Sequence, residues 1–257
     1  MLHYLLLALL VSLAINCTLF LFAYRLKTDK LTDASYALTF ITLSVASFCL
    51  HQVSFSKLIY LLMITIWALR LGGFLLIRIW KTGTDRRFDD MRGKFWRLGK
   101  FWVLQALSVW IILLPALLLF FNSSVRLTAV SLVGTIIWLA GLGIEALADW
   151  QKYQFSNNPR NKGAWIETGI WKFSRHPNYL GEILVWIGVY LAVASSLSAG
   201  QLAVGILSPL FIMILLLFVS GIPLLEKSAQ QRWGDNPRYQ AYKKRTSILL
   251  LLPQKKS

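Results

Sequence analysis

Acidic residues are scarce in this sequence, which has 11 Asp and Glu against 27 Lys and Arg in 257 residues. Charged residues make up only 15% of the chain, whereas a soluble domain carries roughly 25%, and this shortage argues against a soluble globular protein. The two cysteines, Cys17 and Cys49, lie in apolar stretches and form no CxxC pair, so neither a metal site nor a disulfide framework is indicated. The N-terminus lacks the basic region and the small-residue cleavage motif of a signal peptide, and we expect a retained first helix.

Long apolar blocks are what the sequence has in abundance. A helix that spans a bilayer needs about 20 apolar residues, and lipid leaves no backbone group unpaired, so such blocks must be helical. The candidate spans cover residues 1–22, 35–55, 58–80, 101–121, 127–148, 178–198 and 201–222. The sequence therefore predicts an all-α, polytopic membrane protein of about seven transmembrane helices, forming a single domain over residues 1–257.

The connections between these spans differ sharply in positive charge. Lys and Arg number 24 in one alternating set (residues 23–34, 78–100, 149–177 and the tail after 222) and 2 in the other. Cytoplasmic loops of membrane proteins accumulate such residues, which explains the net charge of +16 without nucleic acid as a partner. We expect the N-terminus outside, the C-terminus in the cytoplasm, and basic loops that meet acidic lipids or a phosphorylated cofactor.

Three basic stretches are more than plain loops. Residues 81–100 mix charges with aromatic residues, which is typical of a helix lying on the membrane surface. Residues 149–177 contain Asn-Pro, Lys-Gly and His-Pro breaks and predict a structured, non-helical connection. Residues 223–247 predict a cytoplasmic helix interrupted by Gly-Asp-Asn-Pro.

Ionisable residues within a bilayer are costly, and a functional role is the first hypothesis for them. Arg70 lies in the middle of the third span. Glu145 and Asp149 are four residues apart, hence on one helix face, and Asn178 and Glu182 repeat that spacing. The alternative is that Arg70 only holds helices together, and in either case we expect it to pair with Glu145, Asp149 or Glu182.

The most specific motif is the run Arg-His-Pro-Asn-Tyr-Leu-Gly-Glu at residues 175–182. Its proline breaks the preceding chain, and the free N–H groups of the helix turn that follows favour an anion. An interfacial anchor would explain the Arg, His and Tyr, but not an Asn and a Glu on the same face.

Residues 169–188 resemble the core motif of the membrane reductases and methyltransferases related to steroid 5-alpha-reductase, including sterol C14-reductases and isoprenylcysteine carboxyl methyltransferases. The tail is similar to theirs at Glu226, Arg232-Trp233-Gly234, Tyr239, Tyr242 and Arg245. Trp67, Arg70, Arg78, Asp85-Arg86-Arg87 and Gln105 resemble an uncharacterised bacterial branch with the 5-alpha-reductase C-terminal domain. The resemblance covers roughly residues 65–250 and implies the inner (cytoplasmic) membrane of a bacterium.

The resemblance implies an NADPH-dependent reductase, acting on an activated C=C bond of a lipophilic substrate (isoprenoid, sterol-like or lipid) that enters from the bilayer. It implies a cytosolic cofactor cleft built from the 149–177 connection and the 223–250 tail. The implied cofactor-binding residues are Asp149, Arg160, Lys162, Arg175, His176, Asn178, Tyr179, Glu182, Tyr239, Tyr242 and Arg245. Glu182 and Arg70 are the candidate catalytic residues, and no metal is implied.

One departure from the family pattern concerns the second span. Steroid 5-alpha-reductases place a Gln-Glu pair there to polarise the steroid carbonyl, whereas residues 35–57 contain no Asp or Glu. His51 and Gln52 are the only strongly polar candidates, and this argues against a 3-oxo-steroid substrate. The alternatives are an S-adenosylmethionine-dependent methyltransferase on the same scaffold and a non-catalytic membrane protein.

The charge asymmetry predicts the topology. A reporter fused after Ser257 should be active as a cytoplasmic fusion, whereas one inserted at residues 122–124 should be active as an external fusion. Paired phosphatase and fluorescent-protein fusions measure both positions. A cytoplasmic signal at Asn122 would contradict the seven-helix arrangement.

Overall fold

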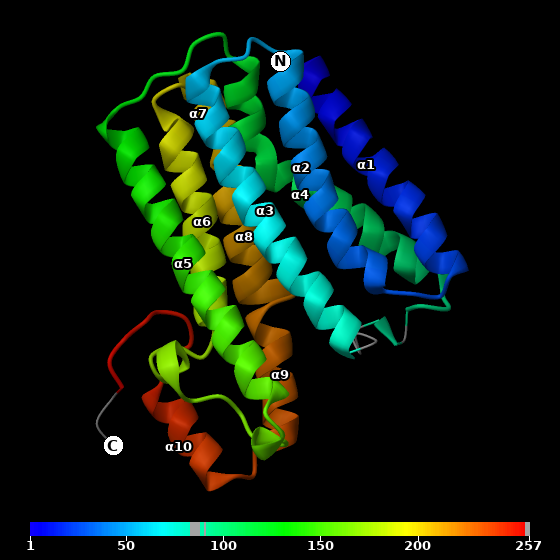
Figure 1. The fold of residues 1–257 in the computed structure, drawn as a ribbon, viewed down its shortest axis with the longest axis vertical. Helices are drawn as coiled ribbons and strands as arrows, with labels where there is room; N and C mark the ends of the chain where they lie inside the picture. The colour runs from blue at the N-terminus through cyan, green and yellow to red at the C-terminus, as the bar shows by residue number, and fades with distance from the viewer. Residues whose placement is uncertain (83–87, 90, 255–257) are drawn as a thin grey trace. The chain divides into compact units, whose positions relative to one another are not determined.

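The computed structural model describes residues 1–82, 88–89 and 91–254, and these are almost entirely helical, with no named β-strand among them (Figure 1). The helices are α1 (Leu2–Arg25), α2 (Lys30–Leu50), α3 (Phe55–Thr82), α4 (Phe95–Phe121), α5 (Ala129–Asn157), α6 (Pro177–Ala194), α7 (Ala199–Gly205), α8 (Leu207–Ile214), α9 (Ile222–Trp233) and α10 (Pro237–Arg245). Short 3-10 turns, Pro159–Asn161 and Gly169–Lys172, lie between α5 and α6, and a π-helical turn, Leu215–Val219, follows α8.

Seven segments are long and apolar enough to cross a membrane. Six of them are α1 to α6, and the seventh, Ala199–Trp233, runs from α7 through α9. The prediction of an all-α integral membrane protein with about seven spanning helices is therefore confirmed. Its orientation in the membrane stays a prediction.

Two expectations for the connections were wrong in part. Residues 149–157 belong to α5, because this stretch contains no proline or glycine and the first break comes at Asn158-Pro159. No surface helix covers the described part of 81–100, where α3 extends to Thr82, turns lie at 88–89 and 91–93, and α4 begins at Phe95. Residues Asp85-Arg86-Arg87 lie outside the described residues. The helix interruption expected near Gly-Asp-Asn-Pro is confirmed between α9 and α10.

Contacts among the described residues divide the chain into two compact units. Unit 1 comprises Met1–Leu132 and Val189–Ser208, and unit 2 comprises Val133–Gly188 and Pro209–Ser257. The single domain expected from the sequence stays a prediction.

A buried polar network joins α1, α2 and α4 in unit 1. The Gln105 side-chain amide donates to Asn16 Oδ1 at 2.9 Å and to Ser35 Oγ at 2.6 Å. The Asn16 amide donates to Thr39 Oγ1 at 3.1 Å, and Ser12 Oγ donates to the Ala106 carbonyl at 2.8 Å. Because unpaired polar groups in lipid cost several kcal/mol each, this mutual pairing specifies how the three helices align.

Lys57 binds backbone carbonyls at the C-terminal ends of two helices of unit 1. Its side chain is fully buried, and Nζ donates to the Gln52 carbonyl at 2.9 Å and to the Phe120 carbonyl at 3.0 Å. These carbonyls lie just after α2 and in the last turn of α4, where a cation meets the negative end of the helix dipole. The sequence pattern predicts a loop at Lys57, whereas the structure places it in the first turn of α3.

Glycines bring α5 and α6 into close contact in unit 2. A Cβ at Gly188 would lie 2.5 Å from the Trp138 nitrogen, and one at Gly181 would lie 2.6 Å from Glu145 Cβ. These pairs set an antiparallel register, by which Asp149 lies level with the first residues of α6. Small residues at helix crossings in membranes allow such an approach.

Two glycines of α5 form a matched pair for testing this crossing. A Cβ at Gly141 would lie 2.7 Å from both the Gly181 carbonyl oxygen and the Val185 nitrogen, whereas one at Gly143 meets nothing within 4 Å. Gly141→Ala should lower the free energy of unfolding by about 1–3 kcal/mol, since backbone atoms must shift. Gly143→Ala should be neutral or slightly stabilising because alanine favours a helix. Thermal unfolding in detergent measures both, and equal effects would contradict the close crossing.

Candidate functional site

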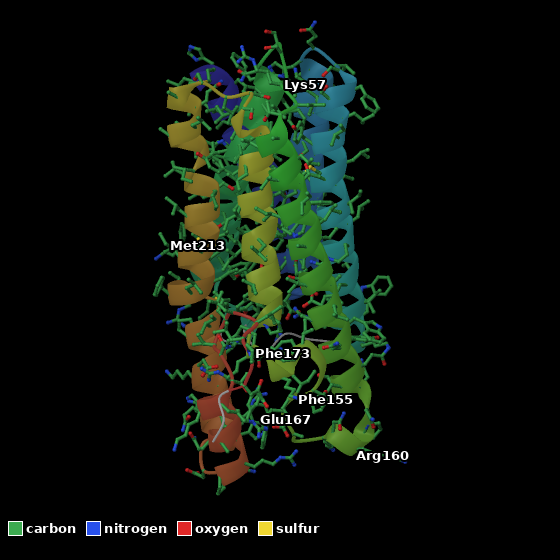
Figure 2. All side chains as sticks on the ribbon, turned by 90° about the vertical axis from the view of Figure 1, so that its left-hand side faces the viewer. Lys57, Phe155, Arg160, Glu167, Phe173 and Met213 are labelled. Atoms are coloured by element: carbon green, nitrogen blue, oxygen red, sulfur yellow. The ribbon has the colours of Figure 1, made fainter. Side chains whose placement is uncertain are left out.

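The structure places all eleven expected cofactor residues in unit 2. Asp149 lies on α5, the Arg175–Glu182 motif at the start of α6, and the two tyrosines and Arg245 on α10. Figure 1 shows α10 and the connection between α5 and α6 together at one end of this unit, where Figure 2 labels Arg160, Glu167 and Phe173. Arg70 lies on α3 in unit 1, so its pairing with a carboxylate of unit 2 stays a prediction.

Glu226 on α9 is the centre of the first cluster. Arg175 Nη1 donates to its Oε2 at 2.6 Å, and His176 Nε2 lies 2.9 Å from its Oε1. Lys243 Nζ from α10 lies 3.7 Å from Oε2. The His176 ring stacks on Tyr179, with the ring centroids 5.7 Å apart. One carboxylate thus joins α9, α10 and the start of α6.

The environment of His176 opposes its protonation. Its side chain is buried, and this desolvation lowers the pKa of His176, although the hydrogen bond to Glu226 acts in the opposite direction. Charge repulsion from Lys152 and Arg175 lowers it further. His176 is therefore favoured in its neutral form, with Nε2–H donating to Glu226.

Glu167, in the connection, is the centre of a second cluster. It pairs with Arg238, and Arg245 Nη2 donates to its Oε2 at 3.2 Å. The Arg238 guanidinium also lies over the Trp165 ring, 5.9 Å from its centroid, and Trp165 packs edge-on against Tyr239 at 5.2 Å. Both ends of α10 are thereby held to the connection.

Backbone contacts close the same assembly. Ser174 and Ser247 form a parallel bridge, in which the Arg175 N–H donates to the Ser247 carbonyl at 2.8 Å. The Tyr242 hydroxyl donates to the Trp171 carbonyl at 2.8 Å. Burial raises the pKa of the Tyr239 and Tyr242 phenols, so both stay protonated at neutral pH. We name residues 158–176, α9, α10 and 246–254 the C-terminal module.

Four polar residues line facing stretches of α5 and α6. Glu145 is 2% exposed and Asp149 is 7% exposed, and the helix register places Asp149 level with Asn178. Asn178 and Glu182 are half-buried and share one face of α6. The close packing of α5 and α6 places the acidic residues of α5 near the Asn/Glu pair of α6, and their convergence on one cofactor cleft stays a prediction.

Arg160 and Lys162 lie apart from these clusters. Both side chains are exposed, beside the 3-10 turn Pro159–Asn161. Within the described residues, neither forms an ion pair. Their guanidinium and ammonium groups are therefore exposed to solvent, whereas Arg175 and Arg245 each already bind a carboxylate.

The C-terminal module also borders an open groove of about 500 Å³. It is lined by Trp150, Gln151, Gln154, Phe155, Asn157, Asn158, Asn161, Thr168 and Gly169. None of the expected cofactor residues lines it. Its side-chain amides also serve local structure, since Gln151 Oε1 accepts from the Ile170 N–H at 3.0 Å and the Asn158 side chain accepts from the Arg160 N–H.

Sequence reasoning missed the two carboxylates that organise the module. Glu226 was noted only within the tail motif, and Glu167 was not noted. The available signal was the scarcity of acidic residues, because any carboxylate near so many Arg and Lys residues is a candidate partner.

The pKa shift of His176 has a consequence for stability. A histidine whose pKa is lowered in the folded state binds fewer protons than in the unfolded state, so the free energy of unfolding falls as pH drops through about 6.5. His176→Gln should reduce this fall between about pH 7.5 and 5.5, whereas His3→Gln, at an exposed site of α1, should not. Thermal midpoints in detergent across that range test this, and an unchanged pH dependence in His176→Gln would contradict it.

Comparison with known proteins places most of the chain in one family. The family described as "Protein of unknown function (DUF1295)" matches residues 19–246. No curated protein and no solved structure matches the chain. A match over this share of the chain shows membership, and the chain belongs to the DUF1295 family, which is a steroid 5-alpha-reductase-like family.

Proposed function

We propose that this protein is an NADPH-dependent membrane reductase of an activated C=C bond in a lipophilic substrate, with the cofactor held by unit 2. The observation that carries the proposal is a set of buried N–H donors in the C-terminal module. Arg175 Nε, Arg245 Nε and Trp165 Nε1 are buried and have no hydrogen-bond acceptor among the described residues. These groups donate only, so an acceptor-rich ligand suits them.

Phosphate groups are such a ligand. Arg175 and Arg245 each direct a terminal nitrogen to a carboxylate, Glu226 and Glu167 respectively, while Nε of each guanidinium has no acceptor. A phosphate oxygen would bind there without displacing either carboxylate, once local movement uncovers the buried nitrogen. Charge-assisted contacts of this kind contribute about 1.5–3 kcal/mol each.

The charge balance of the two clusters supports an anion. Glu226 and Glu167 face four cations, Arg175, Lys243, Arg238 and Arg245, and the lowered pKa of His176 leaves that ring neutral. The excess positive charge, together with exposed Arg160 and Lys162, suits the phosphates of a dinucleotide, including the 2′-phosphate of NADPH.

Asn178 and Glu182 would hold the nicotinamide end, as the resemblance implies. NADPH supplies a hydride, and its oxidised ring is cationic, which suits the buried Asp149 and Glu145 on α5. This end of the site lies where α5 and α6 enter the spanning region, so a lipophilic substrate would approach from the bilayer. Glu182 and Arg70 stay the candidate catalytic residues.

The buried carboxylates of α5 also favour one alternative. S-adenosylmethionine carries a sulfonium and an ammonium group, and Glu145, Asp149 and Glu182 would suit these cations. Its single carboxylate, however, provides fewer anionic acceptors than a dinucleotide does for the buried donors of Arg175, Arg245 and Trp165. The dinucleotide is therefore the better match, and a non-catalytic membrane protein is the third possibility.

Calorimetry on the purified, detergent-solubilised protein tests the proposal. NADPH should bind more tightly than NADH, because only NADPH carries the 2′-phosphate that Arg160 would contact. Arg160→Gln should weaken NADPH binding by about ten- to a hundredfold and leave NADH binding unchanged. Asn178→Ala should weaken both nucleotides because it would contact their shared nicotinamide end.

Arg232→Gln is the matched control, since Arg232 is an exposed arginine of α9 in the same unit, and it should leave both affinities unchanged. If S-adenosylmethionine binds and neither nucleotide does, the proposed function changes from reductase to methyltransferase. No binding of any of the three ligands by a folded protein would favour the non-catalytic alternative.

A further inference from the structure

Five consecutive aliphatic residues, 248–252, follow the polar helix α10. Alternate side chains of this run are exposed: Ile248 by 44%, Leu250 by 52% and Leu252 by 50%, whereas Leu249 and Leu251 are half-buried. Three large aliphatic side chains on one short segment are unfavourable in water. Either another surface or a bilayer must cover them.

The backbone places this segment beside the start of a spanning helix. The Arg175 N–H donates to the Ser247 carbonyl at 2.8 Å, and Ser174 Oγ donates to the Leu249 carbonyl at 2.7 Å. These partners lie two and three residues before Pro177, where the candidate span α6 begins. The segment therefore starts at the depth where a spanning helix passes from polar surroundings into lipid.

The neighbouring side chains match that depth. Phe173, next to the Ser174–Ser247 bridge, is 39% exposed, and Lys172 beside it is exposed. Figure 2 shows Phe173 near the red C-terminal segment. Aromatic rings and lysines with apolar stems are enriched where membrane meets water.

We propose that residues 247–252 form an interfacial anchor, in which Ile248, Leu250 and Leu252 insert into the acyl-chain region of the bilayer. The carbonyls of Ser247 and Leu249 accept hydrogen bonds from residues just before α6, and the Leu252 N–H donates to the Leu250 carbonyl at 2.9 Å. An interfacial location would leave the other backbone groups accessible to water. The segment can therefore lie in the interface without the cost of unpaired groups in hydrocarbon.

This anchor would give the C-terminal module a second attachment to the membrane. α10 would then be held on one side by Glu226 and Glu167 and on the other by a lipid-inserted segment that begins right after it. The anchor involves only residues 172–177 and 247–252 and is independent of the proposed reductase activity.

Site-specific fluorescence in nanodiscs tests the anchor. The chain has two cysteines, Cys17 and Cys49, which are replaced by serine before Leu250→Cys is labelled with an environment-sensitive nitrobenzoxadiazole dye. The discs contain phosphatidylcholine and phosphatidylglycerol, with or without doxyl-labelled phosphatidylcholine carrying its spin label near the headgroup end of the acyl chain. We expect blue-shifted emission and roughly twofold or greater quenching by the doxyl lipid.

Two control sites calibrate the measurement. A label at Leu210, exposed on α8 within a candidate span, should be shielded from water, whereas one at Lys244, exposed on α10, should be neither blue-shifted nor quenched. Leu252→Cys repeats the test at a second position if labelling at 250 perturbs the fold. Behaviour like the Lys244 label would overturn the proposal. Blue-shifted emission without doxyl quenching would also overturn it, since protein rather than lipid would then cover the segment.

Discussion

The absence of water from the bilayer interior is the constraint on which this structure depends. It makes an unpaired polar group within the spans costly, and unit 1 pairs several of its buried polar side chains through the Gln105–Asn16–Ser35 network and through Lys57, which binds two helix-end carbonyls. Helices cannot be driven together by excluding water in lipid, so close contact matters more. In unit 2 glycines at 141, 181 and 188 allow it.

In the C-terminal module, two carboxylates have a corresponding role. Glu226 and Glu167 gather Arg and Lys residues from the connection and from α10. Because the chain has so few acidic residues, each of these carboxylates has several basic partners and leaves the module with excess positive charge. The same arrangement that holds the module together therefore makes it suited to an anionic ligand.

The proposed cofactor site has two parts of opposite charge, the C-terminal module and the α5–α6 pair. Donors and cations are concentrated in the module, where phosphates would bind, and buried carboxylates lie on α5, where a cationic ring would suit them. The carboxylates of α5 would suit the cationic groups of either candidate cofactor. The buried donors and excess positive charge of the module suit a dinucleotide better than S-adenosylmethionine, and this is the physical basis on which we prefer the reductase to the methyltransferase.

Composition and periodicity determined the all-α membrane fold, the seven spans and the break between α9 and α10, because lipid imposes helix length and polarity directly on the sequence. The 175–182 motif and the spacing of Glu145 and Asp149 also identified residues that the structure brings together. Only the tertiary structure decided that Glu226 and Glu167 each bind several basic residues, that Lys57 is buried, and that α4 begins at Phe95 where a surface helix was expected. These outcomes depend on contacts between residues 50 or more positions apart, and no local pattern records which distant carbonyl or cation a side chain will meet.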